Sequence, residues 1–295
     1  MKKKVLLMGA SGSGKTSMRS LIFSNNPASL TSRLGATIDV EQNHVRFLGD
    51  LILNLWDCGG QDSFMDSYLS TQRSTIFQHV GVLIYVFEIG ARDTAKDAVY
   101  YRDCLDALQK YSPDAAVFLL VHKMDLVVGD KATVFERRTR ELEAESGTVA
   151  VTVFGTSIYD ETLYKAWSRI VHTIIPNAAV LSKHLTTFAQ ACSATEAILF
   201  ERTTFLVIAT SSPPDGPEGG LDLSPTRYER TSELIKALKH SYGMPEFTAV
   251  LDGMTKNTYI LLIVHDPTIE TAALKINIRL ARPKFEELQS DSVLA

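Results

Sequence analysis

One short segment near the start of the chain has the residue types and spacing of a phosphate-binding loop. The segment GASGSGKT, residues 9–16, matches the pattern G-x-x-x-x-G-K-[ST] and lies between a predicted strand and a predicted helix. Its glycines allow backbone N–H groups to surround phosphate oxygens, and the N-terminus of the following helix adds positive potential. Lys15 would meet the β- and γ-phosphates of a nucleotide, and Thr16 would reach a Mg²⁺ ion. The loop predicts a nucleotide site, but alone it does not distinguish kinases, motors and switches.

Two further segments carry residues that would sense the γ-phosphate. In RLGATIDVE, residues 33–41, Thr37 lies in a predicted loop and would coordinate Mg²⁺ only while the γ-phosphate is present. In LNLWDCGGQD, Asp57 ends a predicted strand, so that its carboxylate would hold Mg²⁺ through water. Gly60 would donate its backbone N–H to the γ-phosphate, and Gln61 would orient the attacking water. Together these residues favour a nucleotide-hydrolysing switch.

Two segments at later strand ends indicate which base would be bound. HKMD, residues 122–125, ends one predicted strand, and GTSI, residues 155–158, follows the next one. The carboxylate of Asp125 can accept hydrogen bonds from the N1 and N2 donors of guanine, which adenine lacks. Lys123 can lie under the base. The pattern therefore favours GTP and GDP over adenine nucleotides.

Two other functions share part of this pattern. An ATP-using P-loop enzyme, such as a small-molecule kinase, would have the same loop, but Asp125 and Gln61 speak against it. No lid segment rich in catalytic arginines is visible either. A scaffold that binds nucleotide only for stability would have all of these motifs. Equal affinity for an effector in the GDP and GTP-analogue states would favour the scaffold.

The elements that must position these residues alternate between strands and helices. Gly49-Asp50 is a hairpin turn signal, so the two strands beside it should be antiparallel. The alternation otherwise predicts an α/β fold with a mostly parallel sheet, helices on both faces, and ligands at the carboxyl ends of the strands. We expect this domain, residues 1–176, to end at Pro176-Asn177. Strands are expected at 3–9, 44–48, 51–57, 80–88, 115–122 and 148–154, and helices at 15–23, 94–111, 132–146 and 160–174.

The remaining residues, 177–295, predict a separate small α+β domain. Apolar residues recur at helical spacing between Leu181 and Cys192, and 211–225 is rich in Pro and Gly and predicts a loop. No cluster of Asp, His, Cys or Ser suggests chemistry there, so we expect a non-catalytic role. The other expected elements are strands at 197–210, 246–252 and 258–265 and helices at 226–241 and 269–288.

The composition of the 295-residue chain excludes several classes of protein. A net charge of −4 argues against a nucleic-acid binder, which would normally be basic. Cys58, Cys104 and Cys192 are widely spaced and form no CxxC pair, which fits reduced thiols and no zinc framework. No apolar run approaches the ~18 residues needed to cross a bilayer, and lipidation motifs are missing, so direct membrane insertion is not expected.

The order of these motifs is similar to that of Ras-like GTPases, and a narrower resemblance is visible. The segments SGSGKTSMRS, LGATIDVE, LNLWDCGGQD, LVHKMDL and TSIYDETLYKAWS resemble the Rag family of small GTPases, in particular the RagA/RagB class and its fungal counterparts. The resemblance extends over essentially the whole chain, including NTYILLIV and LKINIRLAR in the second domain. It implies a Ras-like GTPase domain followed by a roadblock/longin-like domain.

The resemblance also implies a set of nucleotide contacts. His122 stands where most Ras-like GTPases have asparagine, so guanine selectivity would rest mainly on Asp125; Ser11 stands where many have glycine. Thr16, Thr37 and Asp57 would serve Mg²⁺, while Lys15 and Gln61 would be catalytic. The implied contacts to GTP or GDP are made by Gly9, Ser11, Gly12, Ser13, Gly14, Lys15, Thr16, Ser17, Thr31, Thr37, Gly60, His122, Lys123, Asp125 and Ile158.

The residues themselves predict slow chemistry, and the resemblance implies several partners. No arginine finger is obvious, since a role on the surface is the simpler explanation for Arg33, which begins the segment 33–41. Intrinsic hydrolysis would then be slow, and a GTPase-activating protein could add roughly 10³–10⁵-fold. The implied partners are a RagC/RagD-type GTPase in a heterodimer, a membrane-anchored scaffold complex, and the target-of-rapamycin kinase complex as effector. The implied location is the cytoplasmic face of the vacuole or lysosome, reached through these partners, and the cytoplasm.

Overall fold

A computed structural model of the chain describes residues 2–24, 26–48, 51–175, 178–211 and 248–289. The predicted loop at 211–225 falls outside these residues after Ser211, and the predicted helix at 226–241 falls outside them entirely. The chain divides into two compact units. One comprises Lys2–Val45 and Ile52–Ala166, and the other comprises Arg46–Leu51 and Trp167–Ala295. The division falls inside a helix, and the boundary expected at Pro176 stays a prediction.

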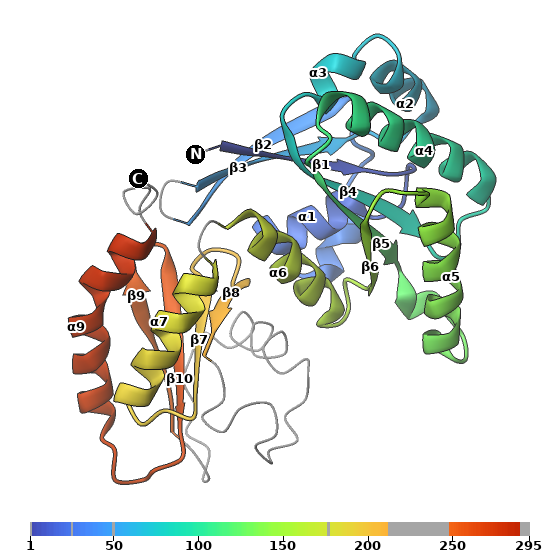
Figure 1. The fold of residues 1–295 in the computed structure, drawn as a ribbon. Helices are drawn as coiled ribbons and strands as arrows, with labels where there is room; N and C mark the ends of the chain where they lie inside the picture. Colours follow the sequence, from blue (N-terminus) through green and yellow to red (C-terminus); the bar gives the residue numbers. More distant parts are fainter. Residues whose placement is uncertain (1, 25, 49–50, 176–177, 212–247, 290–295) are drawn as a thin grey trace. The chain divides into compact units, whose positions relative to one another are not determined.

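The first unit is built on a six-stranded sheet with β1 in an inner position (Figure 1). The strand order is β2-β3-β1-β4-β5-β6, and the pairs β1–β3, β1–β4, β4–β5 and β5–β6 are parallel. Only two residues connect β2 to β3, so these neighbours must run antiparallel. The mostly parallel sheet is thus confirmed. Its strands are β1 (Lys2–Met8), β2 (Val40–Leu48), β3 (Leu51–Cys58), β4 (Val80–Glu88), β5 (Ala116–His122) and β6 (Val151–Thr156).

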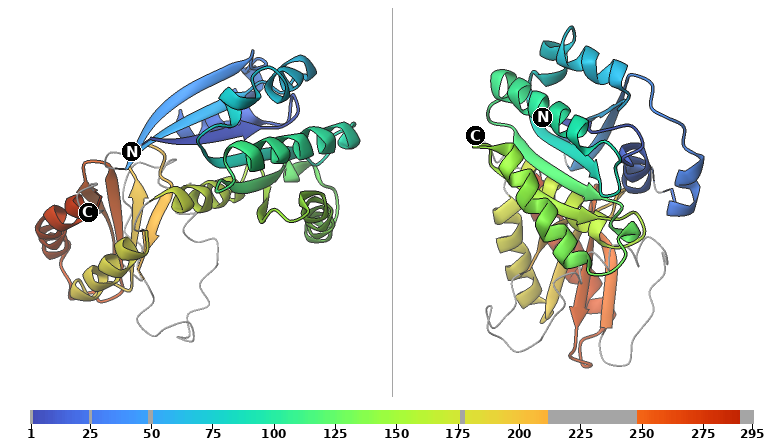
Figure 2. Two further views of the ribbon diagram at one scale, coloured as in Figure 1. Left: turned by 45° about the horizontal axis from the view of Figure 1, so that its top comes forward. Right: turned by 90° about the vertical axis from the view of Figure 1, so that its right-hand side faces the viewer.

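Helices cover this sheet because alternate strand residues are apolar on both faces. On one face, Leu6 and Met8 belong to a core cluster with Leu83, Tyr101 and Cys104. The right-hand view of Figure 2 shows α4 and α5 in front of the strands on this side. The helix α6 (Thr162–Ile174) crosses the division between the units. The other helices of this unit are α1 (Lys15–Phe23), α2 (Asp62–Leu69), α3 (Arg73–Phe77), α4 (Thr94–Tyr111) and α5 (Lys131–Ser146), and its 3-10 turns are η1 (Ala28–Arg33) and η2 (Met124–Leu126).

The predicted helices α1 and α4 are confirmed at both ends, whereas α2 and α3 were not predicted. Their sequence, DSFMDSYLSTQRSTIF, alternates polar and apolar residues too irregularly to show a helical face. In the structure Met65 and Tyr68 of α2 and Ile76 and Phe77 of α3 are buried in the core. Tertiary packing therefore stabilises helices that local preference leaves undecided.

The second unit contains a four-stranded antiparallel sheet in the order β8-β7-β10-β9. Helices α7 (Ala178–Ala191) and α9 (Thr271–Gln289) pack against the sheet and against each other (Figure 1). The α+β character of this part is confirmed. Its strands are β7 (Glu196–Glu201), β8 (Val207–Thr210), β9 (Thr248–Thr255) and β10 (Thr258–Val264).

The single strand expected at 197–210 is wrong, because a turn divides it into β7 and β8. The carboxylate of Glu201 accepts hydrogen bonds from the backbone N of Thr203 at 3.0 Å and of Thr204 at 2.7 Å. Phe205 has a φ of 56°, in the left-handed region. A side chain that satisfies turn donors can reverse a chain whose residue types favour a strand.

The described residues also bear on the expectations about membrane-spanning segments and cysteines. No described helix is long and apolar enough to cross a membrane. Cys58, Cys104 and Cys192 are all buried and form no disulfide. Burial raises the pKa of the Cys58 thiol to about 12, so this thiol stays protonated at neutral pH.

Candidate functional site

A cavity of about 240 Å³ lies where β1 ends and α1 begins. Its walls come from the loop after β1, the start of α1, the segment 34–37 and the loop after β3. The position follows from the strand order, because β1 has β3 on one side and β4 on the other, which opens a crevice at its carboxyl end. The predicted site residues that line this cavity are Ser11, Gly12, Gly14, Lys15, Thr16, Ser17, Thr37, Gly60 and Gln61.

The loop after β1 is fixed from behind by close backbone contacts. A Cβ on Gly9 would lie 2.3 Å from the carbonyl oxygen of Val86, so only glycine allows the loop to approach β4 this closely. Gly14 precedes α1 with a φ of 99°, and a Cβ there would lie 2.6 Å from Cδ2 of His122. Ser13 is fully buried behind the cavity, and its backbone N donates to the carbonyl of Ala10 at 3.2 Å.

Lys15 is a buried cation at the floor of this loop. The residue is only 4% exposed. Its Nζ donates to the carbonyl oxygens of Gly9 at 2.7 Å and Ala10 at 2.8 Å. Burial lowers the Lys15 pKa to about 8, against an opposing effect of Asp57. At pH 7 the amine is still mostly protonated, and it is poorly hydrated. Such a group gains strongly from an anion such as a phosphate.

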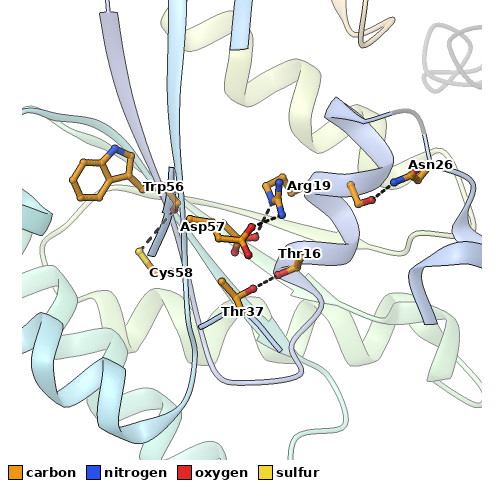
Figure 3. Close-up of polar contacts among 9 residues, drawn as sticks. Thr16, Arg19, Asn26, Thr37, Trp56, Asp57 and Cys58 are labelled. Atoms are coloured by element: carbon orange, nitrogen blue, oxygen red, sulfur yellow. Dashed lines mark hydrogen bonds and ion pairs between the residues drawn. The ribbon is translucent and has the colours of Figure 1, made fainter. Parts of the chain in front are cut away.

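Three oxygen-bearing side chains near α1 form a set suited to a hard divalent cation (Figure 3). The hydroxyls of Thr16 and Thr37 lie 2.6 Å apart, although 21 residues separate them in sequence. Asp57 is fully buried; its Oδ2 accepts from Nε of Arg19 at 2.9 Å. Oδ1 of Asp57 has no hydrogen-bond partner among the described residues. Hydroxyl and carboxylate oxygens are the ligands that Mg²⁺ prefers, so the residues present fit this ion.

A metal ion at this position would be held by hydroxyl oxygens as well as by the Asp57 carboxylate. The described part of the chain contains no group of three or more His, Cys, Asp or Glu residues that could hold a metal ion. The hydroxyls of Thr16 and Thr37 would share the ion with phosphate oxygens and water, as is usual for Mg²⁺ in nucleotide sites.

The loop after β3 touches the phosphate loop directly. The backbone N of Ser11 donates to the carbonyl of Gly60 at 2.9 Å, and a Cβ on Gly60 would lie 2.4 Å from that same nitrogen. Gln61 is the N-cap residue of α2, and its carbonyl accepts from the backbone N of Phe64 and Met65. Its side-chain Oε1 is buried and has no hydrogen-bond partner among the described residues. Gln61 thus lines the cavity and carries a buried amide oxygen without a hydrogen-bond partner among the described residues.

His122 braces the phosphate loop from the side of β5. The register pairs His122 with Thr156 on β6, and Nδ1 lies 2.9 Å from the Thr156 hydroxyl. The residue is 1% exposed, and burial lowers its pKa to about 4. The imidazole is therefore neutral at physiological pH. Its ring lies against Gly14, so the side chain in the asparagine position supports the loop sterically.

The predicted base-recognition residues follow His122 in the same loop region. Lys123 has a φ of 64°, and its Nζ lies 2.9 Å from the carboxylate of Glu88. Oδ1 of Asp125 accepts a 2.6 Å hydrogen bond from the Ser157 hydroxyl. Ile158, half-buried, is the residue after Ser157. The carboxylate expected to read guanine is thus held in one orientation by a neighbour from the loop after β6.

Two residues of the 3-10 turn before Thr37 lie away from the cavity wall. The hydroxyl of Thr31 donates to the carbonyl of Ala28 at 2.7 Å, within the 3-10 turn η1. Arg33 ends the same turn and is exposed. Neither residue lines the cavity. The assignment of Thr31 to the nucleotide stays a prediction.

Four contacting residues were missed by sequence reasoning: Arg19, Glu88, Thr156 and Ser157. Arg19 carries a visible signal, because a spacing of three places it on the same helix face as Thr16. Ser157 lies within the GTSI segment, next to the predicted contact Ile158. Thr156 lies in the same segment, but its contact with His122 follows from strand register. Glu88 gives no local signal, since it reaches the site only through the pairing of β4 with β5.

The chain is similar to several known GTP-binding proteins over most of its length. The family model described as the Gtr1/RagA G protein conserved region matches residues 4–235. GTP-binding protein gtr1 of Schizosaccharomyces pombe is 50% identical, over 99% of this chain and 98% of that protein. Ras-related GTP-binding protein A of Dictyostelium discoideum is 49% identical, over 97% and 98%, and Ras-related GTP-binding protein B of Rattus norvegicus is 46% identical, over 98% and 87%.

A second group of relatives is more distant. GTP-binding protein gtr2 of Schizosaccharomyces pombe is 29% identical, over 72% of this chain and 68% of that protein. Three observations agree: the first group of relatives matches nearly the whole chain, the family model matches residues 4–235, and the cavity at the end of β1 has the residues of a nucleotide site. The chain belongs to the Gtr1/RagA family of GTP-binding G proteins.

Proposed function

We propose that this protein is a GTP-binding switch that hydrolyses GTP slowly and depends on a partner to turn off. The observation that carries the proposal is the placement of two features at the same edge of one sheet. Lys15 and the paired hydroxyls of Thr16 and Thr37 lie at the end of β1, and the Asp125–Ser157 pair lies at the ends of β5 and β6. The first would take the phosphates and the second the guanine base.

The chemistry assigned to these residues is mainly positioning and electrostatics. Lys15 would leave the loop carbonyls to take up negative charge on the β- and γ-phosphates. Gln61, which lines the cavity and whose Oε1 has no hydrogen-bond partner among the described residues, would orient the attacking water. Mg²⁺, held by Thr16, Thr37 and Asp57, would neutralise phosphate charge.

The proposed slow rate of GTP hydrolysis rests on the residue types that line the cavity. No arginine is among the described residues that line it. Arginine fingers contribute about 10³–10⁵-fold in related reactions, so a GTPase-activating partner would supply most of the physiological rate. Single-turnover hydrolysis by the isolated protein within seconds would contradict this part of the proposal.

The proposal extends to a heterodimer with a RagC/RagD-type GTPase. Similarity to proteins named gtr2 and Ras-related GTP-binding protein C supports it, since two related chains of one family can pair through related surfaces. The heterodimer would dock on a membrane-anchored scaffold at the vacuole or lysosome. Its GTP form would act on the target-of-rapamycin kinase complex in response to amino acids.

Nucleotide competition tests the central claim. Fluorescent GDP bound to the full chain should be displaced by GTP and not by ATP at the same concentration. Asp125→Ala should weaken guanine-nucleotide binding. Asp114→Ala serves as the matched control, because Asp114 is exposed and precedes β5, whereas Asp125 follows that strand. Displacement by ATP as effective as by GTP would contradict the guanine assignment.

Partner binding tests the switch. The full chain is loaded with GDP or with a non-hydrolysable GTP analogue, and its affinity for co-purifying partner chains is measured in both states. A switch requires different affinities. Equal affinities would favour a scaffold that holds nucleotide only for stability.

A further inference from the structure

The two carboxylate oxygens of Asp57 have different surroundings. Oδ2 is held by Nε of Arg19 at 2.9 Å, and Oδ1 is buried without a hydrogen-bond partner among the described residues. The whole side chain of Asp57 is inaccessible to solvent. A buried carboxylate needs a counter-charge, because its desolvation is otherwise uncompensated.

Arg19 supplies that charge from the helix that also carries Thr16. Its side chain is 15% exposed, and its Nη2 donates to the Glu41 carboxylate at 2.8 Å while Nε holds Asp57. The guanidinium therefore joins β3, through Asp57, to β2, through Glu41 (Figure 3 shows the Arg19–Asp57 side). A planar fork with separate donors can serve two carboxylates at once, which the ammonium of a lysine does less well.

The other nearby cation does not compete for this task. Nζ of Lys15 donates to the carbonyls of Gly9 and Ala10 and to the Ser13 hydroxyl. Asp57 affects Lys15 only through space. Among the residues that the structure describes, Arg19 is thus the cation in direct contact with the Asp57 carboxylate.

We propose that Arg19 is the built-in counter-cation of Asp57: it positions the carboxylate with Oδ1 left for a Mg²⁺-bound water, and it opposes Mg²⁺ energetically. This inference rests on the proposed Mg²⁺–nucleotide site. A singly charged guanidinium and a doubly charged ion share one carboxylate and repel each other. Through Glu41, the same contact ties the metal site to the strand that follows Thr37.

Binding linkage turns this into a measurable quantity. If Arg19 and Mg²⁺ oppose each other, removing Arg19 must strengthen Mg²⁺ binding. By linkage, the same coupling free energy makes the loss of folding stability in the variant smaller when Mg²⁺ is bound. We expect Arg19→Gln to bind Mg²⁺ roughly 3–10-fold more tightly than the parent protein in the presence of GDP. A structural ion pair independent of the metal would leave the Mg²⁺ affinity unchanged.

The experiment measures thermal unfolding of the full GDP-loaded chain with excess MgCl₂ or with EDTA. Arg19→Gln should lower the melting temperature more in EDTA than in MgCl₂, because Mg²⁺ replaces the missing charge. Arg102→Gln is the matched control: Arg102 pairs with Glu145 on the surface, away from the site, and should show the same small effect in both buffers. Titration with MgCl₂ then gives the affinity directly.

Each possible result of the melting experiment either supports the inference about Arg19 or overturns it. Equal losses of melting temperature in the two buffers, or a larger loss in MgCl₂, overturn the inference. If Arg19→Gln is unfolded in EDTA, recovery of the folded state on adding MgCl₂ supports it, and no recovery overturns it. If Mg²⁺ fails to stabilise even the parent protein with GDP, the proposed function itself fails, which is a different result from equal losses in the variant.

Discussion

Replacing Gly14 by alanine probes the contact between the phosphate loop and His122. Gly14 has a φ of 99°, which L-residues avoid, and a Cβ there would lie 2.6 Å from Cδ2 and 2.8 Å from Nε2 of His122. The imidazole has little room to retreat, because it is 1% exposed and its Nδ1 is bonded to Thr156. The substitution therefore combines backbone strain with a steric clash.

The two contributions can be separated with Gly12, which supplies a matched control. Gly12 also has a positive φ, 81°, but a Cβ there would meet nothing within 4 Å. Gly12→Ala should cost only the backbone strain, about 1–2 kcal/mol. Gly14→Ala should cost this amount and a further ~1–3 kcal/mol for overpacking. Each kcal/mol corresponds to roughly 2–4 °C in melting temperature for a domain of this size.

The assay is equilibrium unfolding of both variants without added nucleotide, followed by a double-mutant cycle with His122→Ala. Removing the ring should reduce the cost of Gly14→Ala to about that of Gly12→Ala, a coupling of about 1–3 kcal/mol. Equal costs for the two glycine substitutions, or no coupling to His122→Ala, would refute the claim that His122 supports the loop.

Three further substitutions test the rest of the site. Ser157→Ala removes the donor to Asp125, a charge-assisted bond of about 1.5–3 kcal/mol, so guanine-nucleotide affinity should fall by about 10–100-fold in a fluorescent-GDP displacement assay; an unchanged Kd would show that Asp125 needs no support. Because burial lowers the His122 pKa from 6.5 to about 4, the unfolded chain takes up this proton first as the pH falls, and stability should drop by about 3 kcal/mol between pH 6.5 and 4. His122→Gln should flatten this part of the profile, and an identical profile in the variant would assign the effect elsewhere. Gln61→Leu should slow single-turnover GTP hydrolysis by about 10²-fold and prolong the GTP state, whereas an unchanged rate would place the water-orienting role on another residue.

Much of the site could be predicted because its information is local. GASGSGKT specifies glycines, a lysine and a threonine within one turn between a strand and a helix, and the structure has that turn with β1 before it and α1 after it. Apolar runs ending in Asp57 or HKMD place polar groups at strand ends, and parallel strands bring those ends to one edge. Periodicity likewise predicted both ends of α4.

Other features depended on contacts between distant residues. The strand expected at 197–210 is divided by a turn that Glu201 stabilises, because a carboxylate that satisfies turn donors outweighs strand preference. The helix α2 forms where Met65 and Tyr68 can be buried, although its own sequence shows no clear apolar face.

The sequence by itself determined the chemical groups of the nucleotide site and the class of fold that presents them. The tertiary structure decided which groups touch. Arg19 reaches Asp57 because α1 passes near the end of β3, and His122 meets Thr156 because β5 and β6 pair in one register. Local patterns encode backbone preference and burial, but the pairing of residues 38 and 34 positions apart is settled only when the whole sheet and its helices pack together.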